Sequence, residues 1–209
     1  MRVRLLTALA VAALAVPALS ACTTKVGAAA IVDGQRISES EVAHYLTPAA
    51  EQVPTQNAAG SATTISPRAY VLDTLINTNL AAKILGNTPA GMPSNNQIVA
   101  AKQQSVAGST VAAFVATFVR HGYTAGFADV LLRERALVVI LQSRAQGGVD
   151  VTGIIKKLRF PVAVSARYGS WNAAGLALDT TPTAGVPGFV TLDPATSTPS
   201  PVPTATPTG

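Results

Sequence analysis

The sequence has one cysteine, Cys22, and two histidines, His44 and His121. A single cysteine excludes a disulfide within the chain, and the cysteine and histidine cluster of a structural zinc site is missing. The two histidines fall on separate predicted helices, where a lone histidine is usually a surface or packing residue. We therefore expect no metal and no other cofactor.

Charged residues are also scarce, at 12% of the chain, and the formal net charge is +5. Nucleic-acid-binding surfaces usually carry a dense basic stripe, so this composition does not favour a nucleic-acid partner. The basic residues are concentrated between Arg120 and Arg167. We interpret this stretch as solvated helix faces. Its alternative is contact with anionic lipid headgroups, which attract each nearby cation by about 1 kcal/mol.

Catalytic motifs are missing as well. The chain has no GxSxG, P-loop, GxGxxG or HExxH pattern. Glu41 is better explained as a helix-capping residue than as a catalytic acid. Asp129 and Glu134 are expected to pair with Arg133 or Arg135 as surface charges. We predict that the protein is not an enzyme, and no small-molecule substrate is identified.

Only the N-terminus carries a long apolar run. Arg2 and Arg4 precede apolar residues 5–19, and Leu19-Ser20-Ala21-Cys22 follows directly. The run is short for a bilayer-spanning helix, which needs about 20 apolar residues, and its layout is that of a secretory signal. A cysteine after Leu-Ser-Ala is the lipobox pattern, which predicts removal of residues 1–21 and acylation of Cys22.

An acylated Cys22 would hold the exported chain to the outer face of the cell membrane, since several acyl chains, palmitate among them, anchor stably. Loss of the two signal arginines leaves 13 basic and 10 acidic residues, a net charge of +3. The alternative is an ordinary signal peptide cut after Ala21. That cut would leave a free thiol in an oxidising compartment.

The C-terminal residues 179–209 are rich in Thr, Pro, Ala and Ser. Proline removes hydrogen-bond donors, and the segment has little apolar surface with which to offset the entropy of ordering. We predict a disordered tail that serves as an O-glycosylated stalk or as a spacer. Residues 22–178 remain as one folded domain.

The start of this domain predicts a strand followed by a helix. Residues 29–32 form the strand, and Asp33-Gly34 the turn after it. Ser38 and Glu41 have the spacing of a capping box. Apolar residues at helical spacing then extend to Val53, so the first helix is predicted to end at Pro54 and a polar loop to continue to Ile65.

The remaining predicted elements share apolar periodicity and recognisable start and stop signals. They are a helix from Ser66-Pro67 with Gly86 as its C′ residue, a helix from Pro93-Ser94 through Val106, a helix over Val111–Val119 closed by Gly122, a helix over Ala125–Ala145 capped by Thr124, a short helix from Asp150 to Leu158, and a strand within Phe160–Arg167. Two isolated strands are unstable alone, so the terminal strands are expected to pair. The predicted fold is mainly α: five to six helices closed by a two-stranded β ribbon made from both ends.

Two segments carry a family resemblance. They are Ala29-Ala-Ile-Val-Asp-Gly-Gln-Arg-Ile-Ser-Glu-Ser-Glu-Val42 and Val164-Ser-Ala-Arg-Tyr-Gly-Ser-Trp171. Together they resemble the N-terminal domain of SurA-like extracytoplasmic chaperones, the family that includes PrsA-type foldases, over most of residues 26–172. The chain has no room for the family's parvulin-type prolyl isomerase domain. The resemblance therefore implies a non-catalytic module that binds unfolded or partly folded exported polypeptides.

Aromatic residues around the fourth and fifth predicted helices are the candidates for contact with such a client. Phe114 and Phe118 are better interpreted as core, which leaves Tyr123 and Phe127 as the candidate client-binding residues. Tyr168 and Trp171 are expected to hold the closing segment against the helices.

Three other functions remain open. The first is an envelope adaptor or structural lipoprotein that binds one specific protein partner. The second is an enzyme of unrecognised type, and the third is a ligand-binding lipoprotein. The bilobal α/β pattern of solute receptors is absent, however, and the chain is short for it.

Overall fold

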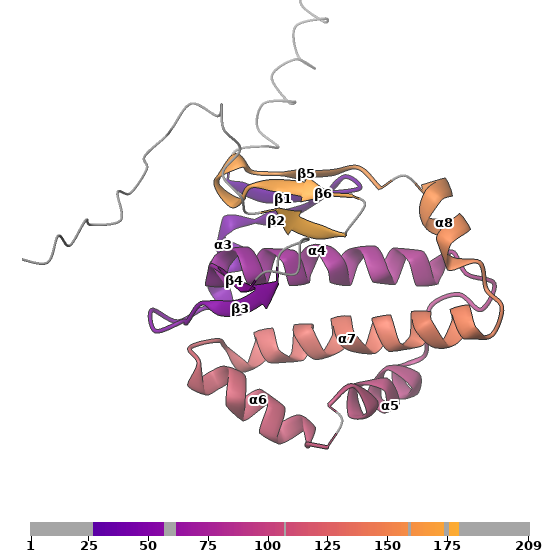
Figure 1. Ribbon diagram of the computed structural model, residues 1–209, viewed down its shortest axis with the longest axis horizontal. Helices are drawn as coiled ribbons and strands as arrows, with labels where there is room; N and C mark the ends of the chain where they lie inside the picture. Colours follow the sequence, from indigo (N-terminus) through magenta and orange to yellow (C-terminus); the bar gives the residue numbers. More distant parts are fainter. Residues whose placement is uncertain (1–26, 57–61, 107, 159, 174–175, 180–209) are drawn as a thin grey trace, which may run out of the picture.

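The architecture places a small sheet over stacked helices (Figure 1). In the computed structural model, the described residues are 27–56, 62–106, 108–158, 160–173 and 176–179. The predicted signal peptide, Cys22 and the tail from residue 180 lie outside them. Below the sheet lies α4 (Pro67–Gly86), then α7 (Ala125–Gln146), and the shorter helices α5 and α6 lie on the far side of α7. The prediction of a mainly helical fold with a small antiparallel sheet component is confirmed.

The upper sheet has three strands in the order β2-β1-β5, namely Gln35–Ser38, Ala28–Val32 and Val162–Val164. Both pairings are antiparallel, and Ala30 lies opposite Ile37 on one side and Val164 on the other. Asp33 and Gly34 connect β1 to β2 with φ values of 48° and 80°, the conformation of a tight hairpin turn. The sequence indicated β1 and the region of β5 but missed β2, so a three-stranded sheet replaces the predicted two-stranded ribbon.

The first helix, α3 (Glu39–His44), begins as predicted. Ser38 Oγ accepts the Glu41 N–H, and the Glu41 side chain accepts the Ser38 N–H, which completes the capping box. The helix ends at His44, however, nine residues before Val53, so the predicted length is wrong. Pro48 explains the early end, because a proline inside a helix removes a backbone donor and clashes with the preceding turn.

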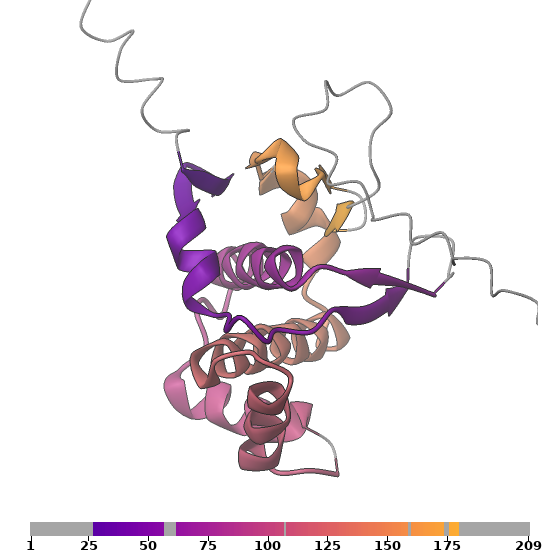
Figure 2. The same cartoon turned by 90° about the vertical axis from the view of Figure 1, so that its left-hand side faces the viewer.

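A β-hairpin follows where the end of that helix and a polar loop were predicted. Its strands are β3 (Val53–Gln56) and β4 (Ala62–Ile65), paired antiparallel with Val53 opposite Ile65. Figure 2 shows the hairpin extending sideways from the N-terminal end of α4. Periodicity alone missed it because Val53 satisfies a helical spacing and a strand equally well.

Helices α4 and α7 form the centre of the fold. Ser66 caps α4 by accepting the Ala69 N–H, with Pro67 in the first turn as predicted. Gly86 is the last helical residue and Asn87 the C-cap, so the prediction of Gly86 as the C′ residue is wrong. The side chains buried on these two helices are mostly aliphatic and include Val71, Leu72, Ile76, Leu80, Leu85, Leu131, Leu132 and Leu137.

The other predicted helices are present with similar limits. They are α5 (Asn95–Ser105), α6 (Val111–Arg120) and α8 (Val151–Leu158). Asp150 Oδ1 accepts the Gly153 N–H at 2.8 Å at the start of α8. Within the described residues, no helix combines the length and the apolar character needed to cross a bilayer.

The end of the domain differs from the single strand predicted over residues 160–167. Strand β5 covers only three residues and leads into the 3₁₀ turn η1 (Ala166–Tyr168). A second small hairpin follows, formed by β6 (Ser170–Asn172) and β7 (Ala177–Asp179). These three-residue strands were too short to leave a periodic signal in the sequence.

Candidate functional site

Tyr123 and Phe127, the predicted client-binding residues, lie in the core. They are 2% and 0% exposed, and their rings stack with centroids 5.0 Å apart. The Tyr123 hydroxyl donates to the Glu51 carbonyl at 2.8 Å, and burial raises the pKa of Tyr123 to about 12. Neither side chain presents a surface to a client, so this assignment is corrected. The half-buried Phe114 and Phe118 pack against the same core, as expected for them.

Tyr168 and Trp171 anchor the closing segment to the rest of the domain. Tyr168 is 5% exposed, and its hydroxyl donates to Oε2 of Glu39 at 2.6 Å. Glu39 also lies 3.4 Å from Arg167 and 4.0 Å from Arg68. Trp171 packs half-buried against the main core. These positions agree with the packing role expected from the sequence.

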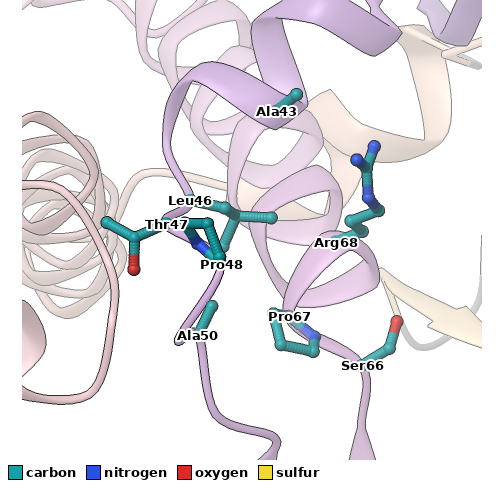
Figure 3. Close-up of a pocket in the computed structure, with 8 residues that line it drawn as sticks. All are labelled: Ala43, Leu46, Thr47, Pro48, Ala50, Ser66, Pro67 and Arg68. Carbon is teal, nitrogen blue, oxygen red and sulfur yellow. The ribbon is translucent and has the colours of Figure 1, made fainter.

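A surface hollow lies between the loop after α3 and the N-terminus of α4 (Figure 3). Its volume is about 480 Å³, within the range of pockets that hold small organic ligands or peptide side chains. Five of its lining residues are apolar, namely Ala43, Leu46, Pro48, Ala50 and Pro67. The other three are polar, namely Thr47, Ser66 and Arg68. We refer to this feature as the proline hollow.

Two of the polar residues of the proline hollow already have hydrogen-bond partners. Thr47 Oγ1 donates to the Gly122 carbonyl at 2.9 Å, and Ser66 Oγ accepts the Ala69 N–H. The Arg68 side chain is 56% exposed and lies near Glu39 at a distance that permits only a weak ion pair. The hollow therefore offers an apolar floor and one cation at its edge.

The local sequence explains why the hollow keeps its shape. Pro48 and Pro67 have fixed φ angles, and Thr47 is tied to Gly122 through both its N–H and its hydroxyl. Leu46, Pro48 and Ala50 fall within the helix predicted to continue to Val53, so the hollow was not predicted. Pro48 was the available signal, because an internal proline usually ends a helix.

Separate from the proline hollow, two partly buried carboxyl groups lie on α4 and α7. Asp73 on α4 has a raised pKa, chiefly because it is buried. Burial, reinforced by the negative charge of Asp73, raises the pKa of Glu134 on α7 to about 7, while Arg135 opposes the rise. Glu134 therefore interacts with Arg135, but it is a half-buried carboxyl and not the predicted surface charge.

Asp73 uses both oxygens of its carboxylate. Oδ2 accepts from the Asn77 side chain at 3.1 Å, and Oδ1 accepts the backbone N–H of Leu178 in β7 at 2.8 Å. Asp73 was not among the predicted site residues. The available signal was a carboxylate placed directly between the buried residues Leu72 and Thr74.

Other predicted charges occupy structural positions. Asp129 forms its ion pair with Lys102 at 2.5 Å, where Arg133 or Arg135 was predicted, and His121 Nδ1 lies 2.6 Å from Glu51 Oε2. Arg144 is not part of a solvated face, because it donates to the carbonyl of Leu85 in the last turn of α4 and to that of Gly91 beyond the helix. Among the residues that the structure describes, no group of three metal-ligating side chains comes together.

No family model matches the chain, and no curated protein or solved structure is significantly similar to it.

Proposed function

We propose that this protein is a non-catalytic, chaperone-like module that binds unfolded or partly folded exported polypeptides. The observation that carries the proposal is the proline hollow, an open apolar recess of about 480 Å³ with a cation at its edge. An exposed recess of this kind takes aliphatic side chains from another chain and removes their apolar surface from water. The resemblance of residues 29–42 and 164–171 to SurA-like chaperones supports the same function.

The proposal includes export and a lipid anchor. Signal cleavage before Cys22 and acylation of its thiol would hold the domain at the outer face of the cell membrane, beside newly exported chains. The lipobox residues Leu19-Ser20-Ala21-Cys22 support this step. Metabolic labelling with a palmitate analogue should mark the wild-type chain and leave the Cys22→Ser variant unlabelled. Equal labelling of both chains would rule out Cys22 as the lipidation site.

The proposal also gives the terminal strands a role in closing the helical body. The pairing of β1 with β5 joins segments more than 120 residues apart, and both strands pack against the core that α4 contributes. A helical domain fastened at its two chain ends would keep the proline hollow open and in place while a client binds. This stabilising role is part of the proposal.

The experiment fills the proline hollow. Ala43→Trp places a large side chain at the lining of the hollow, whereas Ala145→Trp adds the same side chain at an exposed position near the end of α7. The mature chain carrying Cys22→Ser serves as the soluble background. We expect the parent and Ala145→Trp proteins to suppress aggregation of a denatured client at near-stoichiometric ratio, and Ala43→Trp to lose most of this effect.

Two outcomes would reject a general chaperone role. If the parent protein suppresses the aggregation of none of several unrelated clients, the protein has no holdase activity. If in-cell crosslinking from a photoreactive residue at position 50, another residue that lines the proline hollow, yields a single dominant product, the protein is an adaptor for one envelope partner. Several products that disappear in the Ala43→Trp variant would support the chaperone function.

A further inference from the structure

The last described strand of the domain lies against α4 as an extended segment. Residues Leu176–Asp179, which we call the C-terminal strap, bring the Leu178 N–H to Oδ1 of Asp73 at 2.8 Å. The Leu178 side chain is 8% exposed and belongs to the main hydrophobic core. The strap thus makes two kinds of contact at one point, a main-chain hydrogen bond to a side chain and the burial of an aliphatic group.

The strap pairs with its neighbouring strand over a short length and has one strained backbone position. Its strand β7 pairs with β6 over three residue pairs only. Leu176 has a φ of 48°, in the left-handed region where a leucine costs about 1 kcal/mol or more. A two-stranded ribbon of this length is unstable by itself, so its position depends on the docking of Leu178. Displacing the strap would relieve the strained backbone of Leu176, but it would also break its strand pairs and undock Leu178.

The surface beneath the strap contacts it through one main-chain hydrogen bond and one buried aliphatic side chain. Asp73 comes from the rigid helix α4, and its other oxygen is fixed by the Asn77 side chain. A carboxylate that accepts a backbone N–H does not distinguish one residue type from another, while the apolar surroundings select an aliphatic side chain. Extended segments of unfolded polypeptides meet both conditions.

We propose that the C-terminal strap occupies a second polypeptide-binding site, at Asp73, and that an extended client segment with an aliphatic residue displaces it. The strap is then a built-in competitor that keeps this site closed until a client is present. This inference rests on the proposed polypeptide-binding function, but it concerns a site separate from the proline hollow. Its ligand is an extended segment with an aliphatic residue in the place of Leu178.

The first test measures binding of a fluorescent peptide with the sequence of residues 173–182 to full-length variants. Leu178→Ser should release the strap and raise the affinity for the peptide at least about tenfold, because the competing segment is no longer present at high effective concentration. Ala177→Ser, at an exposed position of the same strand, is the matched control and should leave affinity unchanged. Adding Asp73→Leu to Leu178→Ser should remove the gain. A folded Leu178→Ser protein with the affinity of the parent would overturn the proposal.

The second test keeps the wild-type chain and so does not depend on how a variant folds. Hydrogen exchange of the Leu178 amide should accelerate several-fold when the peptide is added, while the amides that pair β1 with β5 keep their protection. Unchanged exchange at Leu178 with saturating peptide would show that the strap is only structural. Because Ala43→Trp leaves Asp73 intact, loss of client binding in that variant and failure of the strap experiment are separate results.

Discussion

The hydroxyl of Tyr168 donates a 2.6 Å hydrogen bond to Oε2 of Glu39, a residue 129 positions earlier in the chain. Glu39 begins α3, directly after the capping residue Ser38, and Tyr168 ends the 3₁₀ turn η1. The bond therefore ties the first helix to the closing segment. Burial, followed by the hydrogen bond to Glu39, raises the pKa of Tyr168 to about 12.

Removal of this hydroxyl should destabilise the domain. Tyr168→Phe removes the hydroxyl that donates to Oε2 of Glu39, a side chain only 20% exposed whose other contacts are the longer ones to Arg167 and Arg68, so we expect the free energy of unfolding to fall by about 1–3 kcal/mol. Urea denaturation followed by circular dichroism measures the change. Tyr45→Phe, at a half-buried tyrosine just after α3, is the control and should cost less. Equal effects of the two substitutions would contradict the structural role of the Tyr168–Glu39 bond.

The half-buried Glu134 predicts a specific dependence of stability on pH. Its folded pKa of about 7 lies above its ordinary value of 4.5, so between these values the folded state binds more protons than the unfolded state. Stability should rise as pH falls from about 8 to 5. The ionised Glu134 carboxylate destabilises the folded state, and this loss of stability reaches its full size only above the folded pKa of Glu134. The size of the effect is roughly 2–3 kcal/mol.

Glu134→Gln tests this effect because it removes the titration while keeping the shape of the side chain. We expect a higher Tm than that of the parent at pH 8 and a much flatter profile of Tm against pH. Asp129→Asn, at a mostly exposed position on the same helix, should keep the parental slope. If Glu134→Gln kept the parental slope of Tm against pH, the buried position of this carboxyl would be contradicted.

Two glycines with positive φ differ in what surrounds them. Gly122, with φ of 82°, lies where an added Cβ would be 2.5 Å from the backbone of Ala49 and Ala50. Gly148, with φ of 89°, has nothing within 4 Å of that position. Both Gly→Ala variants carry the cost of a left-handed alanine, about 1 kcal/mol, and only Gly122→Ala adds a backbone clash.

We therefore expect Gly122→Ala to lower the free energy of unfolding by about 3 kcal/mol or more, and Gly148→Ala by about 1 kcal/mol. Thermal and urea unfolding compare the two variants directly. Similar losses in both would mean that the chain from residue 47 to 50 does not lie against Gly122.

Local patterns were sufficient for much of the fold. Ser38 with Glu41, Ser66 with Pro67, and Thr124 each marked the start of a helix that the structure contains. Caps and turns act over three or four residues, so the information for them is contained in the local sequence. The end of the first helix was predicted wrongly. Apolar residues continue at helical spacing to Val53, although Pro48 already breaks the helix.

The candidate sites depended on contacts between distant residues. Tyr123 and Phe127 were chosen as aromatic residues around the fourth and fifth predicted helices, but packing against Tyr70 and Phe118 buries them. The proline hollow needs residues 43–50 beside residues 66–68, and the Asp73 site needs Leu178. No periodicity records which segment covers which, so local signals such as Pro48 could mark single residues of these sites but could not bring their distant parts together.

The sequence by itself determined where the helices begin, the tight turn at Asp33-Gly34, and the lipobox that predicts export and acylation at Cys22. Each of these depends on neighbouring residues, whose steric and hydrogen-bonding preferences act locally. Only the tertiary structure decided that β2 joins the sheet, that Tyr123 and Phe127 are core, and that Asp73 receives the strap. Burial and pairing between distant segments depend on how the helices pack together, and packing is a property of the whole chain.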